Sequence, residues 1–255
     1  MTNFKALHAG PDLLILPNAW DAISARVVAN AGAKAIATSS AAVAWAHGYP
    51  DGNALPVPLL LATLRAVVRA VDVPVTADIE AGYSDDPQTV GETVRALIDI
   101  GVAGINLEDG NAWSDLLCAK IDAVRKAGEI FINARTDGFL KGPGNVDEAI
   151  ARAKRYTDAG ADGIFVPGVT DAAQIAALVQ GITLPLNVMA RPGVPSAAEL
   201  QKLGVRRLSA ATWLARAAMN TVREKAAAFL ATGDSDVLAA GSVPPVDYNA
   251  MFGRG

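Results

Sequence analysis

The sequence predicts a (β/α)₈ barrel of parallel strands, for three reasons. Short runs of apolar and β-branched residues alternate eight times with longer stretches in which apolar residues recur every three or four positions. No hairpin signal joins consecutive strand-like runs, so each connection is expected to be a right-handed crossover between parallel strands. The 255 residues suit eight such units and contain no linker-like stretch, which favours one domain over 1–255.

The expected elements follow one another in a regular order. The strand-like runs are Leu13–Leu16, Ala35–Ser39, Val73–Ile79, Gly104–Glu108, Ile130–Ala134, Gly163–Val166, Leu184–Val188 and Arg206–Ala210. The helix-like stretches are Ala22–Asn30, Leu59–Ala70, Thr89–Ile100, Asp115–Ala127, Val146–Ala159, Ala172–Val179 and Ala197–Leu203, and a further helix is expected at Arg216–Ala231.

Glycine and proline mark the entries to these strands. Before the second, fourth, sixth and eighth strands, a glycine ends the helix-like stretch as a C-terminal cap does: Gly32, Gly101, Gly160 and Gly204. The third and seventh strands are instead entered through Pro74 and Pro185, and proline is tolerated at the first residues of a strand but not in its middle. This alternation favours a closed barrel over an open doubly wound sheet.

Composition excludes several classes of function. The net charge is −4 and no basic cluster is present, so a nucleic-acid partner is not expected. No apolar run approaches the roughly 20 residues of a membrane span, and the N-terminus lacks the pattern of a signal peptide, which predicts a cytoplasmic protein without membrane contact. The single cysteine, Cys118, cannot form an internal disulfide.

Acidic residues end two neighbouring strand-like runs. Asp78 and Glu80 are two positions apart, so both side chains leave the same face of a strand, and Glu108 ends the next run. Carboxylates that converge at strand ends would form a hard oxygen site suited to Mg²⁺, with Mn²⁺ as an alternative. The other interpretation is solvated strand-end acids or helix caps.

Polar residues follow nearly every predicted strand. In a parallel barrel the carboxyl ends of the strands form one face, where the active site lies. The residues expected there are Asn18, Ser39, Ser40, Asp78, Glu80, Glu108, Asp109, Asn133, Arg135, Asn187 and Ser209.

Several segments together resemble the isocitrate lyase/phosphoenolpyruvate mutase superfamily, from about residue 10 to residue 215. They are Pro17–Arg26, Thr38–Val43, Gly48–Asp51, Asp78–Tyr83, Leu107–Asp109 and Asn133–Asp137. The resemblance implies a (β/α)₈ barrel, Mg²⁺ bound by one close carboxylate with others acting through water, and chemistry on small 2-oxo or 2-hydroxy acids.

The resemblance also implies a role for each matching residue. Asp78 matches the principal metal carboxylate of the family, and Glu80 and Glu108 match two further metal-side acids. The second acid is Asp in the family motif, so Glu80 is a departure. Asp51 matches a loop aspartate that closes over the waters on the metal side.

On the substrate side, Ser39, Ser40 and Ala41 match a Ser-Gly-Gly turn that holds a carboxylate through backbone N–H groups. Ser40 and Ala41 stand where the family has glycines, which restricts the backbone conformations open to that turn. Arg135 matches an arginine that pairs with substrate oxygens, the alternative being a salt bridge to Asp137 or Glu108. Asn187 is expected to bind substrate, and Asp51, Arg135 and Glu108 are the expected catalytic residues.

One departure concerns the lid. Family lyases carry a long gating loop with a Lys-Lys/Arg-Cys-Gly-His motif after the Leu-Glu-Asp segment, whereas here Gly110–Trp113 precede the next helix. Cys118 lies inside a helix-like stretch without a basic neighbour, so it is not expected to be catalytic.

Three functions follow from this reading. The first is a Mg²⁺-dependent lyase that cleaves a C–C bond of a small 2-oxo or 2-hydroxy acid, decarboxylation included, through an enolate that the metal stabilises. The second is phosphoenolpyruvate mutase or phosphonopyruvate hydrolase chemistry at a P–C bond, and the third is a barrel that binds an oxo acid without turnover. Because relatives exchange a C-terminal helix between subunits, residues 216–255 predict a homodimer or homotetramer.

Overall fold

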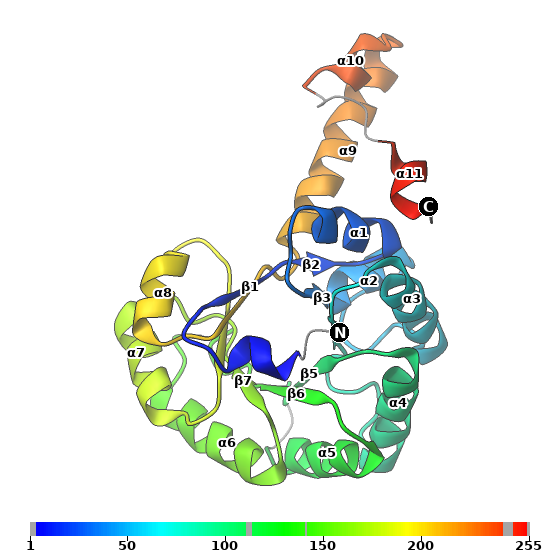
Figure 1. The fold of residues 1–255 in the computed structure, drawn as a ribbon. Coiled ribbons are helices and arrows are strands. Elements are labelled where there is room, and N and C mark those ends of the chain that lie inside the picture. Colours follow the sequence, from blue (N-terminus) through cyan, green and yellow to red (C-terminus); the bar gives the residue numbers. More distant parts are fainter. Residues whose placement is uncertain (1–3, 111–113, 141, 242–246, 254–255) are drawn as a thin grey trace.

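The computed structural model describes residues 4–110, 114–140, 142–241 and 247–253, and its strands form a parallel barrel surrounded by helices (Figure 1). Every strand pairing is parallel, in the order β1-β9-β8-β7-β6-β5-β4-β3-β2. The predicted fold class is confirmed. The strands are β1 (Leu14–Leu16), β2 (Asn18–Ala19), β3 (Ile36–Thr38), β4 (Val75–Asp78), β5 (Gly104–Glu108), β6 (Phe131–Arg135), β7 (Gly163–Phe165), β8 (Leu186–Met189) and β9 (Arg207–Ser209).

The predicted strand Leu13–Leu16 corresponds to β1, and the extended chain continues past Pro17, which has no N–H to donate, into β2. Strand β1 pairs with β9, and β2 pairs with β3. One extended segment therefore joins both ends of the sheet and closes the ring. The sequence analysis missed β2.

Helices follow the strands and cover the outside of the ring (Figure 1). Three match their predicted bounds: α1 (Ala22–Asn30), α6 (Val146–Ala159) and α8 (Ala197–Leu203). Helix α2 was not predicted, because its seven residues are mostly alanine and show no clear apolar period. The other elements are η1 (Lys5–His8), α2 (Ser40–Ala46), α3 (Val57–Ala70), α4 (Pro87–Ile100), α5 (Ser114–Ala127), α7 (Ala172–Gly181), α9 (Trp213–Thr232), α10 (Asp236–Ala239) and α11 (Tyr248–Phe252).

Local sequence explains where the helices begin and end. The side chains of Asp21, Asp86 and Asn145 accept hydrogen bonds from backbone N–H groups in the first turns of α1, α4 and α6. The predicted glycine caps are confirmed at α4, α6 and α8, where the C-cap glycine has φ between 97° and 110°.

Apolar side chains pack outside the ring of strands and also fill one of its mouths. The larger core lies between strands and helices and includes Leu60, Ile105 and Ile164, all with no exposed surface. The amino-terminal mouth of the barrel is filled by η1, where His8 stacks on Phe131 at 4.3 Å and Phe4 packs edge-on against both rings. The carboxyl ends of the strands are therefore the open end.

The C-terminal segment leaves the barrel. Helices α9 and α10 project away from the ring, whereas α11 returns to lie beside α1 (Figure 1), where Arg26 Nε donates to the carbonyl of Met251 at 2.8 Å. Residues 242–246 and 254–255 of the predicted 216–255 tail lie outside the described residues. Within the described part of the chain, no helix has the length and apolar character needed to cross a bilayer. The single-domain assignment and the cytoplasmic location stay predictions.

Candidate active site

Asp78 ends β4 at the carboxyl face of the barrel, and its surroundings fix its carboxylate. Its backbone N–H donates to Thr38 Oγ1 at 3.1 Å, and Ser40 Oγ donates to its Oδ2 at 3.1 Å. Oδ1 is buried and has no hydrogen-bond partner among the described residues. A buried carboxylate oxygen is costly to leave unpaired, so this atom marks a position for a cation or another donor.

Arg135 ends β6 and lies between two carboxylates. Its Nε and Nη2 donate to Asp137 at 2.6 and 3.1 Å, and its Nη1 lies 2.7 Å from Glu108 Oε2. Its guanidinium also faces the ring of Phe165 at 5.7 Å. Both ion pairs named as the alternative to substrate contact are therefore present. The planar fork is held in a single orientation, and substrate contact by Arg135 stays a prediction.

Glu80 is turned toward a loop. Its Oε2 accepts hydrogen bonds from the backbone N–H groups of Gly52 and Asn53, and its Oε1 accepts one from Tyr83 Oη at 3.1 Å. The loop that carries Asp51 thus lies against the end of β4. The carboxylate of Glu80 is engaged by three donors.

The acids at this end influence one another. Burial raises the pKa of Asp78 and of Glu80, and the neighbouring charge of Asp51 raises both further. Burial raises the pKa of Glu108 to about 8; Arg135 opposes that rise, whereas Asp78, Asp137 and Glu80 reinforce it. Carboxylates held close together away from water repel one another, and a bound divalent cation relieves this repulsion.

The carboxylates at this end of the barrel could bind such a cation directly through one oxygen, Oδ1 of Asp78. Within the described ranges, no three or more His, Cys, Asp or Glu side chains are placed to hold one metal ion together. Glu80 and Glu108 face other partners, whereas Asp78 offers a free oxygen. The arrangement agrees with one close carboxylate, Asp78, and other acids acting through water. Roles for Glu80 and Glu108 toward a metal stay predictions.

The predicted Ser39–Ala41 turn is the start of a helix. Ser39 is the N-cap residue of α2, and Ser40 and Ala41 form its first turn, so no glycine is needed there. Ser40 is bonded to Asp78 and therefore positions the carboxylate. Substrate binding by Ser39, Ser40 and Ala41 is not tested by these contacts.

A polar layer crosses the barrel interior below Asp78. Asn106 Oδ1 accepts hydrogen bonds from Asn133 Nδ2 at 2.9 Å and from Arg207 Nη2 at 3.1 Å. Asn187 is 1% exposed, and neither of its amide atoms has a hydrogen-bond partner in the described part of the chain. Substrate binding by Asn187 stays a prediction.

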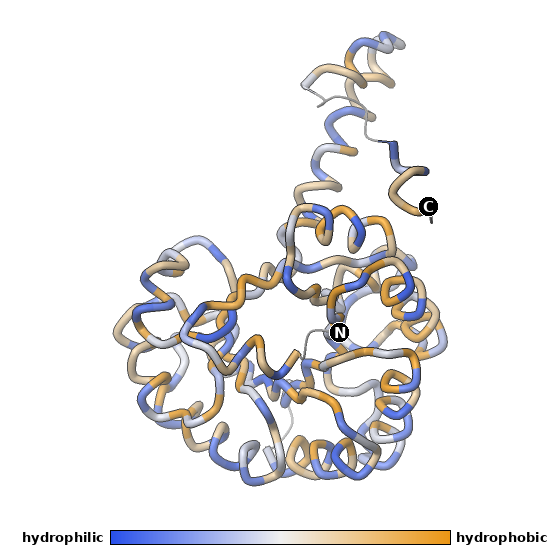
Figure 2. Tube along the Cα trace, in the orientation of Figure 1, coloured by the Kyte–Doolittle hydropathy of each residue, from blue (hydrophilic) through white to orange (hydrophobic). Residues whose placement is uncertain are grey.

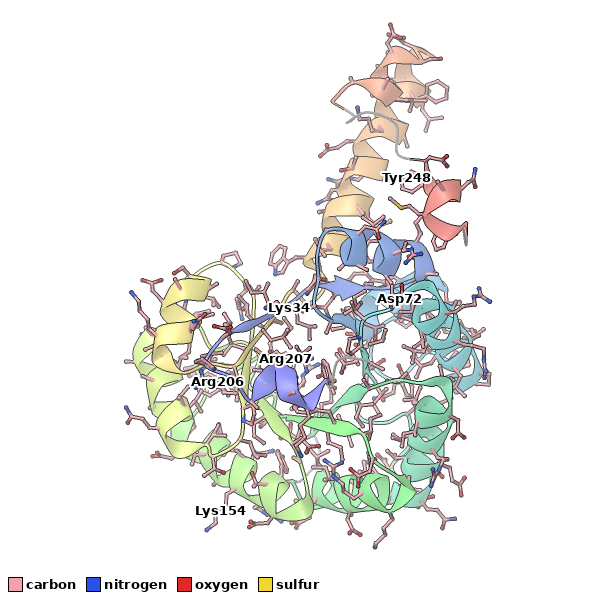
Figure 3. The ribbon with its side chains drawn as sticks, viewed as in Figure 1. Lys34, Asp72, Lys154, Arg206, Arg207 and Tyr248 are labelled. Atoms are coloured by element: carbon pink, nitrogen blue, oxygen red, sulfur yellow. The ribbon has the colours of Figure 1, made fainter. Side chains whose placement is uncertain are left out.

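Arg207 is the residue that the sequence analysis missed. It is 1% exposed inside the barrel (Figure 3), and burial lowers its pKa to about 9 while the charge of Asp78 opposes that fall. The signal was available, because Arg207 lies two residues before Ser209 and so on the same face of β9.

Asp109 does not face the site. Its Oδ2 accepts hydrogen bonds from Tyr156 Oη at 2.7 Å and Arg152 Nη1 at 2.9 Å, and its Oδ1 accepts one from the backbone N–H of Asp137 at 3.1 Å. Its own N–H donates to the carbonyl of Arg135 at 3.0 Å. Asp109 thus fixes the chain at Arg135 and at Asp137 and ties it to α6.

The shortened segment after Asp109 is only partly described. Residues 111–113 of this segment lie outside the described residues. Cys118 lies on α5, donates through Sγ to the carbonyl of Arg155 at 3.7 Å, and has a pKa raised by burial. A raised pKa disfavours the thiolate, which supports the prediction that Cys118 is not catalytic.

The family model described as phosphoenolpyruvate phosphomutase matches residues 4–230. The chain belongs to this family. The match covers the barrel and most of α9, and it confirms the predicted superfamily, that of isocitrate lyase and phosphoenolpyruvate mutase.

The relatives of this phosphoenolpyruvate mutase family member are named for different reactions. A Burkholderia cenocepacia structure described as a candidate phosphonomutase is 44% identical, covering 87% of this chain and 96% of its own, with a TM-score of 0.83. A Corynebacterium glutamicum protein named as a probable 2-methylisocitrate lyase is 31% identical, covering 71% of this chain and 64% of its own. An oxaloacetate decarboxylase from Pseudomonas savastanoi is 29% identical, covering 80% of this chain and 75% of its own. The named relatives are lyases and mutases, so this chain is an enzyme of that superfamily.

Proposed function

We propose that this enzyme is a Mg²⁺-dependent lyase that cleaves a C–C bond of a small 2-oxo or 2-hydroxy carboxylic acid, decarboxylation included. The main observation behind the proposal is the Oδ1 atom of Asp78, which has no hydrogen-bond partner among the described residues and lies among acids whose negative charges repel one another. Bound Mg²⁺ would supply Lewis-acid polarisation of the 2-oxo group and charge neutralisation. Relatives named as 2-methylisocitrate lyase and oxaloacetate decarboxylase support the reaction class.

The chain's own groups fit three tasks. Arg135, fixed by Asp137, offers a permanent positive charge to a substrate carboxylate or to an oxyanion that develops during cleavage. Glu108, with its pKa raised to about 8, is mostly protonated at neutral pH in the metal-free site and suits proton transfer to a carbanion-like product. Asn187 supplies a free amide donor and acceptor.

Substitution of Asp78 tests the proposal. Asp78→Asn keeps the shape but removes the charge, and we expect the Mg²⁺-dependent release of pyruvate-type product from oxaloacetate-like substrates to fall at least about 100-fold. Product formation is measured across a panel of oxo acids with and without a chelator. The control is Asp72→Asn, since Asp72 is exposed on the surface (Figure 3). Undiminished turnover in the chelator would refute the proposal.

A P–C bond reaction is the second candidate. The phosphonomutase relative at 44% identity and the matching family model favour it. The loop after β8 lacks the glycine pair typical of a phosphate cradle, although Arg191 lies there, exposed, with Nη1 3.4 Å from the carbonyl of Gly168. Release of inorganic phosphate from phosphonopyruvate, compared with product release from an oxo acid, distinguishes the two. The third alternative, a barrel without turnover, disagrees with the activities named for the relatives.

We also propose that the enzyme forms a homodimer or homotetramer through its C-terminal helices. Helix α9 projects from the barrel with Met219, Val222 and Leu230 more than half exposed. A groove of about 760 Å³ lies beside β1, whose run is hydrophobic in Figure 2, and Ile15 in it is 59% exposed. Apolar surface on both the arm and the groove suits coverage by a second copy of this chain.

A further inference from the structure

The loop formed by residues 51–53 is attached to the turn after β4 by three hydrogen bonds, and a fourth within the turn holds the carboxylate that receives two of them. Glu80 Oε2 accepts from the N–H of Gly52 at 2.8 Å and from the N–H of Asn53. Asn53 Oδ1 accepts from the N–H of Tyr83 at 3.2 Å, and Tyr83 Oη donates to Glu80 Oε1 at 3.1 Å. Each segment therefore both donates to and accepts from the other.

This attachment holds the backbone in an unfavourable conformation. Asn53, Glu80 and Tyr83 have φ of 60°, 52° and 59°, in the left-handed region that non-glycine residues seldom adopt. Lys120 supports the turn from α5, because its Nζ donates to the carbonyl of Ala81 at 2.8 Å. Such conformations persist where surrounding contacts impose them, and they concentrate at functional sites.

The residue type explains why the attachment exists. Glu80 stands where the family motif has Asp, and its extra methylene lets the carboxylate reach the backbone of a loop 27 residues earlier in the chain. Three donors engage its two oxygens, and the residue is 3% exposed. A carboxylate satisfied in this way is a clamp for the loop and has little capacity left for direct coordination.

The loop places Asp51 within electrostatic range of Asp78. Asp51 is exposed, yet its charge acts on both Asp78 and Glu80, so the three carboxylates lie within electrostatic range. Their mutual repulsion would push an untethered loop away from the site. The backbone bonds to Glu80 oppose that repulsion.

We propose that Glu80 and Tyr83 form a latch that fixes the Asp51–Asn53 loop over Asp78, so that Glu80 is a positioning residue acting on the cation site through Asp51. The latch itself stands on the hydrogen bonds above. Its effect on the cation rests on the proposed function.

Amide hydrogen exchange at Gly52 and Asn53 tests the latch without any assay of turnover. Both residues are exposed, so protection of their N–H groups reports the bonds to Glu80. In Glu80→Asp we expect exchange at least about tenfold faster, because the shorter side chain cannot reach. In Tyr83→Phe we expect exchange at Gly52 and Asn53 to be about threefold faster, because only the hydrogen bond from Tyr83 Oη to Glu80 Oε1 is lost. Glu92→Asp is the matched control, since Glu92 is an exposed acid that accepts from Gln88.

A double-mutant cycle tests the action through Asp51. Mg²⁺ affinity is measured by calorimetry for Glu80→Asp, Asp51→Asn and the double variant. We expect each single variant to bind Mg²⁺ about tenfold more weakly, and the double variant to lose no more than Asp51→Asn alone, because both changes remove one contribution. A merely structural Glu80 would lower the melting temperature without this pattern.

Each other outcome is decisive. Unchanged Gly52 and Asn53 exchange in Glu80→Asp, faster exchange when Mg²⁺ is added to the wild type, or additive losses of affinity would overturn the proposal. If Glu80→Asp does not fold, Tyr83→Phe and the effect of Mg²⁺ on wild-type exchange give the same decision. A wild-type enzyme that binds no Mg²⁺ but keeps its protected amides would refute the proposed function and leave the latch intact.

Discussion

Four acids end neighbouring strands at one face of the barrel, yet each has a different environment. Asp78 keeps a free oxygen, Glu80 holds a loop, Glu108 pairs with Arg135, and Asp109 is buried against α6. Residue type and position at a strand end placed all four at the same end. Apart from Tyr83, which bonds to Glu80 from three residues away, the partners that decide what each carboxylate can do come from segments 27 to 47 residues away in the chain.

Glu108 makes the stability of the metal-free enzyme depend on pH. Its pKa is raised in the folded state to about 8 from an ordinary value of 4.5, so the folded protein holds this proton where the unfolded chain has released it. The stabilisation is complete below pH 4.5 and is lost progressively as pH rises to about 8. We therefore expect the melting temperature in a chelator to fall between pH 5.5 and 8.5.

The control is Glu108→Gln, whose amide side chain cannot titrate. Its melting temperature should fall less steeply between pH 5.5 and 8.5 than that of the wild type. Thermal melts followed by circular dichroism measure both proteins. Parallel profiles for the wild type and the variant would show that Glu108 is not the titrating group.

At the level of elements, glycine caps set where helices stop and strands begin. Gly101 and Gly204 both end a helix, with φ of 99° and 97°. They differ in surroundings: a Cβ on Gly101 would lie 3.5 Å from Val68 Cγ1, an ordinary contact, whereas a Cβ on Gly204 would lie 2.9 Å from Val179 Cγ1.

This difference predicts a rank order of stability. Gly101→Ala should lower the free energy of unfolding by about 1 kcal/mol, the cost of the left-handed conformation alone. Gly204→Ala should lower it by about 2–3 kcal/mol, because the methyl group also displaces Val179. Urea denaturation measures both values, and equal losses would contradict the steric part of the argument.

At the scale of the whole molecule, the C-terminal arm is the least covered part. Trp213 at its base donates through Nε1 to the carbonyl of Ala190 at 2.7 Å, and Arg216 lies over the ring of Trp45 at 5.3 Å. Beyond this base, α9 leaves the barrel and keeps apolar side chains exposed. An isolated helix of this kind is stabilised mainly by packing, which the proposed second copy would provide.

Charge on the apolar face of α9 should separate the copies. We expect Val222→Glu combined with Leu230→Glu to convert the assembly to monomers, since burying two unpaired carboxylates in an apolar contact is strongly unfavourable. Light scattering after size-exclusion chromatography gives the mass. Arg223→Glu, on the same exposed helix, is the control and should leave the assembly unchanged. A monomeric wild type would contradict the proposed assembly.

The sequence by itself determined the barrel, the order of most helices and strands, and the end of the barrel at which the site lies. These features depend on periodicity, on glycine and proline at strand entries, and on polar residues after strands, all of which are local. It failed at β2, where the extended chain continues past Pro17, and at α2, where alanines gave no clear period.

Only the tertiary structure decided which residues act together. The engagement of Glu80 by the Gly52 and Asn53 amides, the support of Arg135 by Asp109, and the burial of Arg207 depend on contacts between distant segments. Such contacts are set by the register of strands and by which side chains fill the space between them. Spacing along the chain determines at which strand end a carboxylate lies, and three-dimensional packing determines which donors form hydrogen bonds with it.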